Sequence, residues 1–257
     1  MRIWHISDTH TFHEMLEVPT NIDMVIFSGD CSNPRDPFAN EPEVRDFIDW
    51  YSTLPIKHKI FVAGNHDTSV EKRLVTKYDF MNAGIIYLEN DYTTIEGLKI
   101  FGSPHTPTFG HGWAFNKDRT KLERIWRKLI DIDTDIIINH GPPKGILDIS
   151  FDRFGAMERC GDKSLMNRII EVKPKLVLFG HIHNCEDIIN QGVLQISTLP
   201  TKFSNGSVVK DGRFGQLSSN GNVVEIKTKK SIFEKVKYEL ERVLQKYRSS
   251  SQTKIQR

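Results

Sequence analysis

Short apolar runs alternate along the chain with segments in which apolar residues recur at helical spacing. The runs have the length of strands and are nearly continuous, which is typical of strands in a sheet that is covered on both faces. They predict strands over residues 2–6, 24–27, 60–63, 136–139 and 175–179. Residues 44–51 and 122–130 carry apolar side chains every three or four positions and therefore predict helices. This alternation favours an α/β (α+β) class.

A second set of apolar segments is shorter and more closely spaced. Residues 85–88, 92–95 and 99–101 predict an antiparallel meander, with Glu96-Gly97 as a turn signal. Segments of the same style follow at 193–196, 208–209 and 223–226. We therefore expect one domain over residues 1–230, with two mixed β-sheets and flanking helices.

Residues 231–247 show a separate amphipathic pattern. Ser231 and Glu234 fit a capping box at its start. An apolar stripe then runs along an otherwise charged helix through Ile232, Val236, Leu240, Val243, Leu244 and Tyr247. We expect this C-terminal helix to pack on its own domain, with a contact to a second copy of the chain or to another partner as the alternative. Residues 248–257 are expected to form a flexible tail.

Composition narrows the class of protein. The 257 residues include 35 basic and 33 acidic side chains, and this balance gives no argument for a nucleic-acid patch. No apolar run approaches the roughly 20 residues that a membrane helix needs, and we expect no membrane association. The three cysteines are odd in number and sparse, which favours reduced thiols. The chain opens without a basic-then-apolar leader, and we expect a cytoplasmic protein.

Polar side chains follow each of the five longer predicted strands. The segments are Ser7-Asp8-Thr9-His10, Ser28-Gly29-Asp30, Gly64-Asn65-His66-Asp67, Asn139-His140-Gly141 and Gly180-His181-Ile182-His183. Ligands bind at the carboxyl ends of strands in open α/β sheets. Any one of these segments alone fits a solvated turn, but five in one chain indicate a shared site.

The side-chain types indicate a metal centre. Imidazole, carboxylate and amide donors without cysteine suit Mn²⁺, Fe²⁺ or Zn²⁺ better than a thiolate zinc site. Seven ligands from these segments exceed the needs of one tetrahedral ion. Two ions that share a carboxylate, at about 3.5–4 Å from each other, would use them all.

These five segments, in this order, resemble the sequence blocks of the calcineurin-like metallophosphoesterases. The resemblance implies a sandwich of two mixed β-sheets flanked by helices, with a dinuclear metal centre. By position, it assigns one metal to Asp8, His10, Asp30 and His183. It assigns the other metal to Asp30, Asn65, His140 and His181, with Asp30 bridging. Manganese is the expected metal, with iron or zinc as alternatives.

The resemblance also implies a reaction. A hydroxide that bridges the two metals would attack phosphorus in line. His66 would contact the phosphate and protonate the leaving oxygen. Asp67 is expected to orient the His66 imidazole by hydrogen bonding, without binding a metal itself.

The expected substrate class depends on segments outside the blocks. After Gly29-Asp30 the chain reads CSNPRDP, unlike the Ser/Thr protein phosphatases, and no tyrosine closely follows Asp30 as in purple acid phosphatases. Residues 102–116 and 140–148 are similar to the small metallophosphoesterase-domain (MPPED-like) branch, although Cys160-Gly161-Asp162 departs from the Gly-Cys pair expected at the pocket rim. This branch is close to the class III cyclic-nucleotide phosphodiesterases.

The branch implies hydrolysis of nucleotide phosphodiesters, including 2′,3′- or 3′,5′-cyclic nucleotides. A phosphomonoesterase and a non-cyclic phosphodiesterase are the alternatives, since fold alone does not choose among them. The third alternative is a binding module that has lost catalysis and docks a partner through the C-terminal helix. The complete ligand set disfavours this alternative.

Residues 103–119 predict a long loop that is rich in histidine and aromatic residues. We expect His105, His111 and Trp113 to contact the substrate together with Asn65 and His66. An aromatic ring there could stack on a base, an interaction worth about 1–3 kcal/mol in single-strand binders. In the alternative interpretation, Trp113 and Phe115 anchor the loop to the core.

Other candidate residues are given structural roles. His5 is expected to be a strand residue, and His13 and His58 are expected to be exposed. The cysteines, including Cys31 and Cys185, are expected to be small buried apolar residues.

Overall fold

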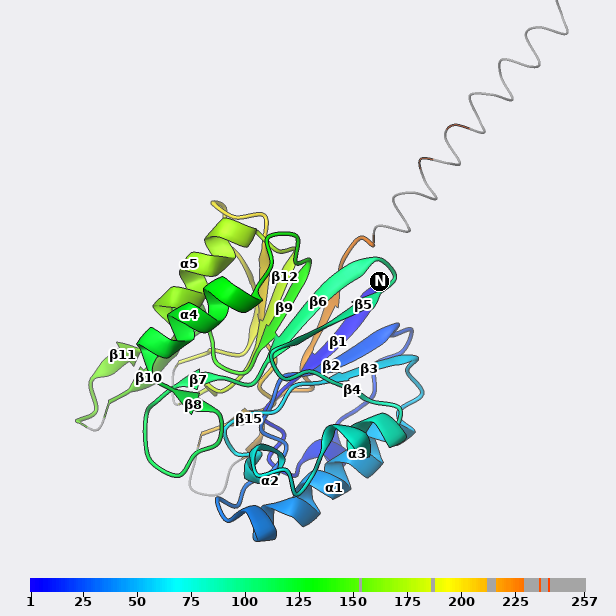
Figure 1. The fold of residues 1–257 in the computed structure, drawn as a ribbon, viewed down its shortest axis with the longest axis vertical. Helices are drawn as coiled ribbons and strands as arrows, with labels where there is room; N and C mark the ends of the chain where they lie inside the picture. The colour runs from blue at the N-terminus through cyan, green and yellow to red at the C-terminus, as the bar shows by residue number, and fades with distance from the viewer. Residues whose placement is uncertain (153, 186–187, 212–215, 229–235, 237–239, 241–257) are drawn as a thin grey trace, which may run out of the picture.

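The structure is a computed structural model that describes residues 1–152, 154–185, 188–211 and 216–228, together with residues 236 and 240. Two β-sheets pack face to face, and helices cover the outer face of each sheet (Figure 1). The expected two-sheet sandwich with flanking helices is confirmed.

The first sheet has five strands in the order β17-β1-β2-β3-β4. They are β17 (Asn222–Glu225), β1 (Arg2–Ile6), β2 (Met24–Phe27), β3 (His58–Phe61) and β4 (Ile86–Tyr87). Strands β1 to β4 are parallel, and β17 is antiparallel to β1. The carboxyl ends of the parallel strands therefore share one edge of the sheet.

The second sheet has six strands in the order β13-β14-β12-β9-β6-β5. They are β13 (Gly192–Gln195), β14 (Lys202–Asn205), β12 (Leu176–Phe179), β9 (Ile136–Asn139), β6 (Leu98–Ser103) and β5 (Asp91–Ile95). The four central strands are parallel, and the edge strands β13 and β5 are antiparallel to their neighbours. Both sheets are thus mixed, as expected.

Three short strand pairs lie outside the two sheets. They are β7 (Thr106–Pro107) with β8 (Asn116–Lys117), β10 (Ile149–Phe151) with β11 (Met157–Arg159), and β15 (Val209–Lys210) with β16 (Gln216–Leu217). The pair β7–β8 closes the base of the loop that was expected over 103–119.

Alternating side chains of the strands fill two different cores. On β2, Met24 and Ile26 face the other sheet, whereas Val25 and Phe27 face the helices. Successive side chains of a strand point to opposite faces, so a strand between two apolar layers must be apolar at every position. This is the physical reason for the continuous apolar runs in the sequence.

Four helices form the outer layers. Helices α1 (Pro37–Thr53) and α3 (Lys77–Asn82) cover the five-stranded sheet, and α4 (Arg119–Leu129) and α5 (Lys163–Val172) cover the six-stranded sheet (Figure 1). A short helix, α2 (Thr68–Glu71), and a 3-10 turn, η1 (His13–Met15), lie in connections. Helix α1 begins at Asp36, whose carboxylate accepts hydrogen bonds from the Phe38 and Ala39 amides.

One predicted arrangement is wrong. The hairpin β5–β6 forms as expected, with positive φ angles at Glu96 and Gly97 (49° and 77°), which the favoured two-residue hairpin turn needs. However, β4 pairs in parallel with β3 in the other sheet, so the expected three-stranded meander does not exist. Strand β14 and helix α5 were not predicted. The sequence of β14 is not a continuous apolar run, because it contains Ser204 and Asn205, which are buried against polar groups.

The predicted C-terminal helix over 231–247 and the tail over 248–257 lie outside the described residues, apart from residues 236 and 240. The domain limit at residue 230 remains a prediction. In the part of the chain that the structure describes, no helix combines the length and the apolar character needed to cross a membrane.

Candidate metal centre

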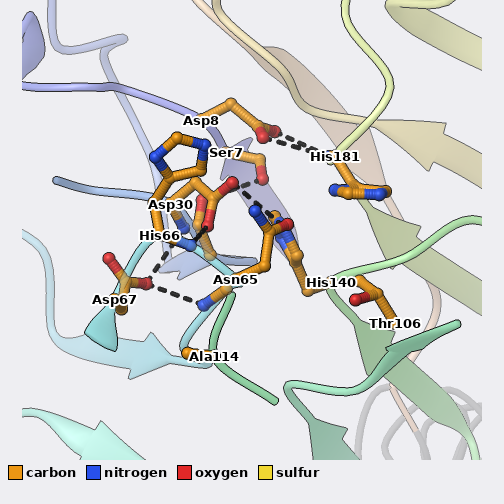
Figure 2. A network of polar contacts seen from close by, with 12 residues as sticks. Ser7, Asp8, Asp30, Asn65, His66, Asp67, Thr106, Ala114, His140 and His181 are labelled. Atoms are coloured by element: carbon orange, nitrogen blue, oxygen red, sulfur yellow. Dashed lines mark hydrogen bonds and ion pairs between the residues drawn. The ribbon is translucent and has the colours of Figure 1, made fainter. Parts of the chain in front are cut away.

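Five strands bring their carboxyl ends to one place (Figure 2). Asp8 and His10 follow β1, Asp30 follows β2, Asn65 and His66 follow β3, His140 follows β9, and His181 and His183 follow β12. The site lies where the two sheets meet, because β1, β2 and β3 belong to one sheet and β9 and β12 to the other.

The donor atoms form three overlapping groups, within each of which all atoms lie within 4.8 Å of one another. The groups are Asp8 with His10 and His183, His10 with Asp30 and His66, and Asp30 with His140 and His181. His181 and His183 therefore fall in different groups, although only one residue separates them. Asp30 belongs to both the second and the third group, and His10 links the first group to the second.

In several site histidines, one ring nitrogen is held by a group of the protein outside the centre, so that the other ring nitrogen faces the centre. The Nδ1 atoms of His10 and His140 lie 3.2 and 2.8 Å from the carbonyl oxygens of Ser32 and Ser28. A carbonyl oxygen only accepts, so each Nδ1 carries a hydrogen and each Nε2 faces the centre, where it can donate a lone pair once it is deprotonated. The Nε2 atom of His140 lies 2.9 Å from Asn65 Oδ1 and 3.2 Å from Asp30 Oδ2.

His183 has a carboxylate in the same role. Its Nδ1 atom lies 2.8 Å from Asp211 Oδ1, and its Nε2 atom lies 3.1 Å from Asp8 Oδ1. Hydrogen bonds of this kind fix the tautomer and the ring orientation of metal-binding histidines. Asp211 was missed in the sequence because the segment at the end of β15 carries no other signal of chemistry.

The backbone of the site is strained. Asp8, His10, Asp30 and His181 have positive φ angles of 53°, 43°, 64° and 68°. Residues other than glycine rarely adopt this region, and such residues concentrate at functional sites.

Glycines leave space for the carboxylates. A Cβ atom on Gly180 would overlap the Asp8 carboxylate and the Ser7 hydroxyl, and one on Gly64 would overlap the Asp30 carboxylate. Glycine is therefore required at 180 because the Asp8 and Ser7 side chains approach its backbone closely. The left-handed backbone conformation occurs at the next residue, His181.

Charge at the centre is balanced between buried acids and imidazoles. Burial opposes ionisation of Asp30, but His140 and the neighbouring imidazoles hold the pKa of Asp30 well below its usual range. Burial likewise opposes charge on His140, but the Asp30 carboxylate raises the pKa of His140 to about 9. Asp211 and Asp8 outweigh burial in the same way and raise the pKa of His183 to about 10.

Two other imidazoles favour the neutral form. Burial lowers the pKa of His10 to about 4 and that of His181 to about 3. Neutral imidazoles and buried carboxylates together form a donor set that fits divalent metal ions, whose positive charge would balance that of the carboxylates. Binding of metal would displace the protons that His140 and His183 hold.

Asp67 has a different role from the one expected. Its buried carboxylate accepts hydrogen bonds from the backbone amides of Asp30, Cys31 and Gly64 at 2.7–3.0 Å and from the Ser32 hydroxyl at 2.9 Å. His66 instead has its Nδ1 atom 3.1 Å from the carbonyl oxygen of Asn33. Asp67 therefore ties the segment after β2 to the segment after β3, and the predicted Asp67–His66 contact is wrong.

The loop between β7 and β8 lies over the centre. The Trp113 ring is 4.3 Å from the His66 ring, and the Phe109 ring is 5.0 Å from the His181 ring, measured between centroids. The Ala114 amide donates to the Asn65 carbonyl oxygen at 2.9 Å. Trp113 therefore contacts the site, whereas Phe115 is buried and anchors the loop.

His105 does not fit the expected substrate role. It is buried, with Nδ1 at 3.0 Å from the Phe115 carbonyl oxygen and Nε2 at 3.1 Å from Asn90 Nδ2. Both ring nitrogens are thus used within the protein, so this prediction is wrong. His111 is exposed on the loop, and its substrate contact stays a prediction.

Of the remaining histidines, His5 lies in β1 as expected and is buried. His13 is buried against the rings of Phe47 and Trp50, and His58 is half-buried at the start of β3, so the expected exposure of both is wrong. Cys31 and Cys185 are buried, as expected, and Cys160 is half-buried.

Comparison with known proteins gives the same picture. Residues 1–185 match the model of the calcineurin-like phosphoesterase family. Human metallophosphoesterase domain-containing protein 1 is 32% identical over 227 residues, which cover 79% of this chain and 64% of that protein. UPF0046 protein K07C11.7 of Caenorhabditis elegans is 30% identical over 207 residues, covering 75% of this chain and 67% of that protein.

The chain thus spans somewhat less than two thirds of the length of the human relative. Among solved structures, the phosphopantetheinyl hydrolase PptH from Mycobacterium tuberculosis superposes with a TM-score of 0.53 at 15% identity, over 80% of this chain and 88% of its own. That likeness concerns the fold alone. With the family model matching more than half of its length, this chain belongs to the calcineurin-like phosphoesterases.

Proposed function

We propose that the protein is a phosphodiesterase that depends on two divalent metal ions and acts on nucleotide phosphodiesters such as 2′,3′- or 3′,5′-cyclic nucleotides. The observation that carries the proposal is the position of Asp30, which shares one donor group with His10 and another with His140 and His181. A carboxylate between two sets of imidazoles is the arrangement that a two-metal hydrolase needs.

The assignment of residues to each metal is the one that the family resemblance implies. Asp8, His10, Asp30 and His183 would hold one ion, and Asp30, Asn65, His140 and His181 would hold the other. Ions bound there supply Lewis acidity, which lowers the pKa of a water molecule and offsets negative charge on phosphate oxygens. Manganese is the metal that we propose, because the donors are imidazoles, carboxylates and an amide without thiolate.

His66 is proposed to protonate the leaving oxygen. Its Nδ1 hydrogen is engaged by the Asn33 carbonyl oxygen at 3.1 Å, so Nε2 is the atom at which a proton is exchanged. His66 also shares a donor group with His10 and Asp30, which puts it within reach of a phosphate held at the centre.

The choice of a diester rests on sequence similarity to the small metallophosphoesterase-domain branch. We extend the proposal to a cytoplasmic location, and to self-association through the predicted helix over 231–247.

Hydrolysis of bis-p-nitrophenyl phosphate and of p-nitrophenyl phosphate by the Mn²⁺-loaded protein tests the reaction class. We expect faster turnover of the diester, followed by turnover of at least one nucleotide in a screen of 2′,3′- and 3′,5′-cyclic compounds. The Asp30→Ala variant serves as the blank. Preference for the monoester would instead indicate a phosphomonoesterase, and two bound metals without turnover of any ester would indicate a binding module.

A further inference from the structure

Arg35 and Trp113 form a cation–π pair beside the centre. The guanidinium carbon of Arg35 lies 3.8 Å from the centroid of the Trp113 ring. Arg35 comes from the exposed segment between β2 and α1, and Trp113 comes from the loop between β7 and β8. Two segments that are distant in the sequence thus meet in one contact.

This pair lies next to the proposed acid. The Trp113 ring is 4.3 Å from the His66 ring, so the indole lies in contact with both the guanidinium and the imidazole. His66 is also held from the same segment as Arg35, through the Asn33 carbonyl oxygen. Arg35 therefore lies beside His66, which is the side of the leaving group in the proposed reaction.

The charge of Arg35 is available to a ligand. Among the described residues, no carboxylate forms an ion pair with its guanidinium. The adjacent Asp36 carboxylate is occupied in capping helix α1 through the Phe38 and Ala39 amides. A guanidinium that stacks by its face on an aromatic ring keeps its N–H groups free at the edge, where they can bind a phosphate in bidentate fashion.

Stacking of a base on Trp113 is less consistent with this arrangement. Arg35 covers the indole at 3.8 Å and His66 packs against it, so a base would have to displace one of them. Phe109 is the more accessible aromatic residue of the loop, with 52% of its surface exposed. The Arg35–Trp113 pair is better suited to an anion than to a planar ring.

We propose that Arg35, held over the Trp113 ring, binds a second phosphate on the leaving-group portion of the substrate. The preferred substrates are then nucleotide phosphodiesters that carry an additional phosphate besides the one hydrolysed. This inference rests on the proposed function, in that it extends the substrate class of the same site. Arg35 acts as a specificity-determining residue.

The test compares adenosine 2′,3′-cyclic phosphate with its 5′-phosphorylated form, which differ only in the second phosphate. We expect kcat/KM of the Mn²⁺-loaded wild type to be on the order of tenfold higher for the 5′-phosphorylated form, as for a charge-assisted hydrogen-bonded pair. Arg35→Met should bring this ratio to about one, mainly by lowering kcat/KM for the 5′-phosphorylated form, and Arg35→Lys should retain part of the ratio. Lys121→Met, an exposed substitution on α4 with the same change in net charge, should leave the ratio unaltered.

A ratio of about one in the wild type, or an equal loss for both substrates in Arg35→Met, would overturn the proposal. Failure of the proposed function would show differently, as turnover of neither cyclic nucleotide. In that event calorimetric titration of the Mn²⁺-loaded protein with adenosine 3′,5′-bisphosphate and with adenosine 3′-phosphate decides the role of Arg35. The proposal is supported if the wild type binds the bisphosphate more tightly than the monophosphate and Arg35→Met abolishes this difference. Equal binding of the two nucleotides by the wild type refutes it.

Discussion

At the scale of single residues, the two ring nitrogens of each site histidine have different contacts. His10 and His140 use Nδ1 to hold on to backbone carbonyl oxygens and leave Nε2 for the centre. His66 is held in the same way by Asn33, but its ring is also covered by Trp113. The anchoring of His66 is like that of the proposed ligands, so its proposed role in proton transfer has to be separated from metal binding by experiment.

Replacement of His66 by alanine should separate catalysis from metal binding. We expect His66→Ala to keep two metals per chain and to lose turnover by about 10²–10⁴-fold, the usual contribution of general acid catalysis. Metal analysis of the purified variant, together with kcat on the diester substrate, provides the measurement. Loss of a metal from this variant would show that His66 is a ligand and not the acid.

His181 and His183 should serve different ions. The Nε2 atom of His183 lies beside Asp8, whereas His181 shares its donor group with His140 and Asp30. We expect His181→Ala and His183→Ala each to weaken a different one of two Mn²⁺ binding steps in calorimetric titration. The same step lost in both variants would mean that one ion uses both residues.

Among the elements, the segments that follow the strands place stricter demands on backbone conformation and space than the strands themselves. Each ligand segment must turn at once after its strand and bring its side chain back toward the centre. Positive φ angles at Asp8, Asp30 and His181 achieve this, and neighbouring glycines leave the space. The network around Asp67 then ties the β2 and β3 segments together.

The turn after β12 can be tested through Gly180. A methyl group there would overlap the Asp8 carboxylate, so Gly180→Ala should displace Asp8 from the site and weaken binding of metal. Metal content after dialysis and the thermal midpoint of the metal-loaded protein measure this effect. Gly110→Ala is a matched control, because its nearest neighbour would be Trp113 at 3.4 Å, an ordinary contact. Equal metal content in both variants would contradict the close-approach argument.

For the molecule as a whole, the site depends on how the two sheets are joined. His5 of β1 lies between them, with Nδ1 at 2.8 Å from Ser204 Oγ on β14 and Nε2 at 2.9 Å from Ser28 Oγ. The carbonyl oxygen of Ser28 in turn accepts from His140. A buried polar chain thus runs from the joint between the sheets to a candidate metal ligand.

His5 should make stability depend on pH. Burial lowers the pKa of His5 to about 3 from an unfolded value of 6.5, so between these values the unfolded chain binds more protons. The contribution of His5 is therefore complete above pH 6.5 and falls as the pH drops toward 3, by about 2 kcal/mol between pH 7 and pH 5.

Urea unfolding of the metal-free protein at pH 7 and pH 5 measures this dependence. His5→Gln should lose less stability than the wild type between the two pH values, whereas His111→Gln, at an exposed position, should behave as the wild type. An unchanged pH dependence in His5→Gln would contradict the assignment.

Much of this protein could be predicted from local patterns. The central strands are continuous apolar runs because apolar layers cover both of their faces, and the predicted ends differ from the observed ones by no more than two residues. The seven candidate ligands follow strand ends, where a parallel sheet must gather them. Strand β14 escaped prediction because its buried polar residues are paired across the fold, as Ser204 is with His5.

The sequence by itself determined the five longer strands, the polar segments that follow them and the family, because these depend on the order and spacing of residues along the chain. Only the tertiary structure decided that β4 leaves the neighbouring hairpin to join the other sheet, that Asp67 binds backbone amides instead of His66, and that His105 is buried. It also placed Asp211 behind His183 and Arg35 on Trp113. Each of these contacts joins residues that are distant along the chain, and such contacts depend on how the two sheets pack and not on any local pattern.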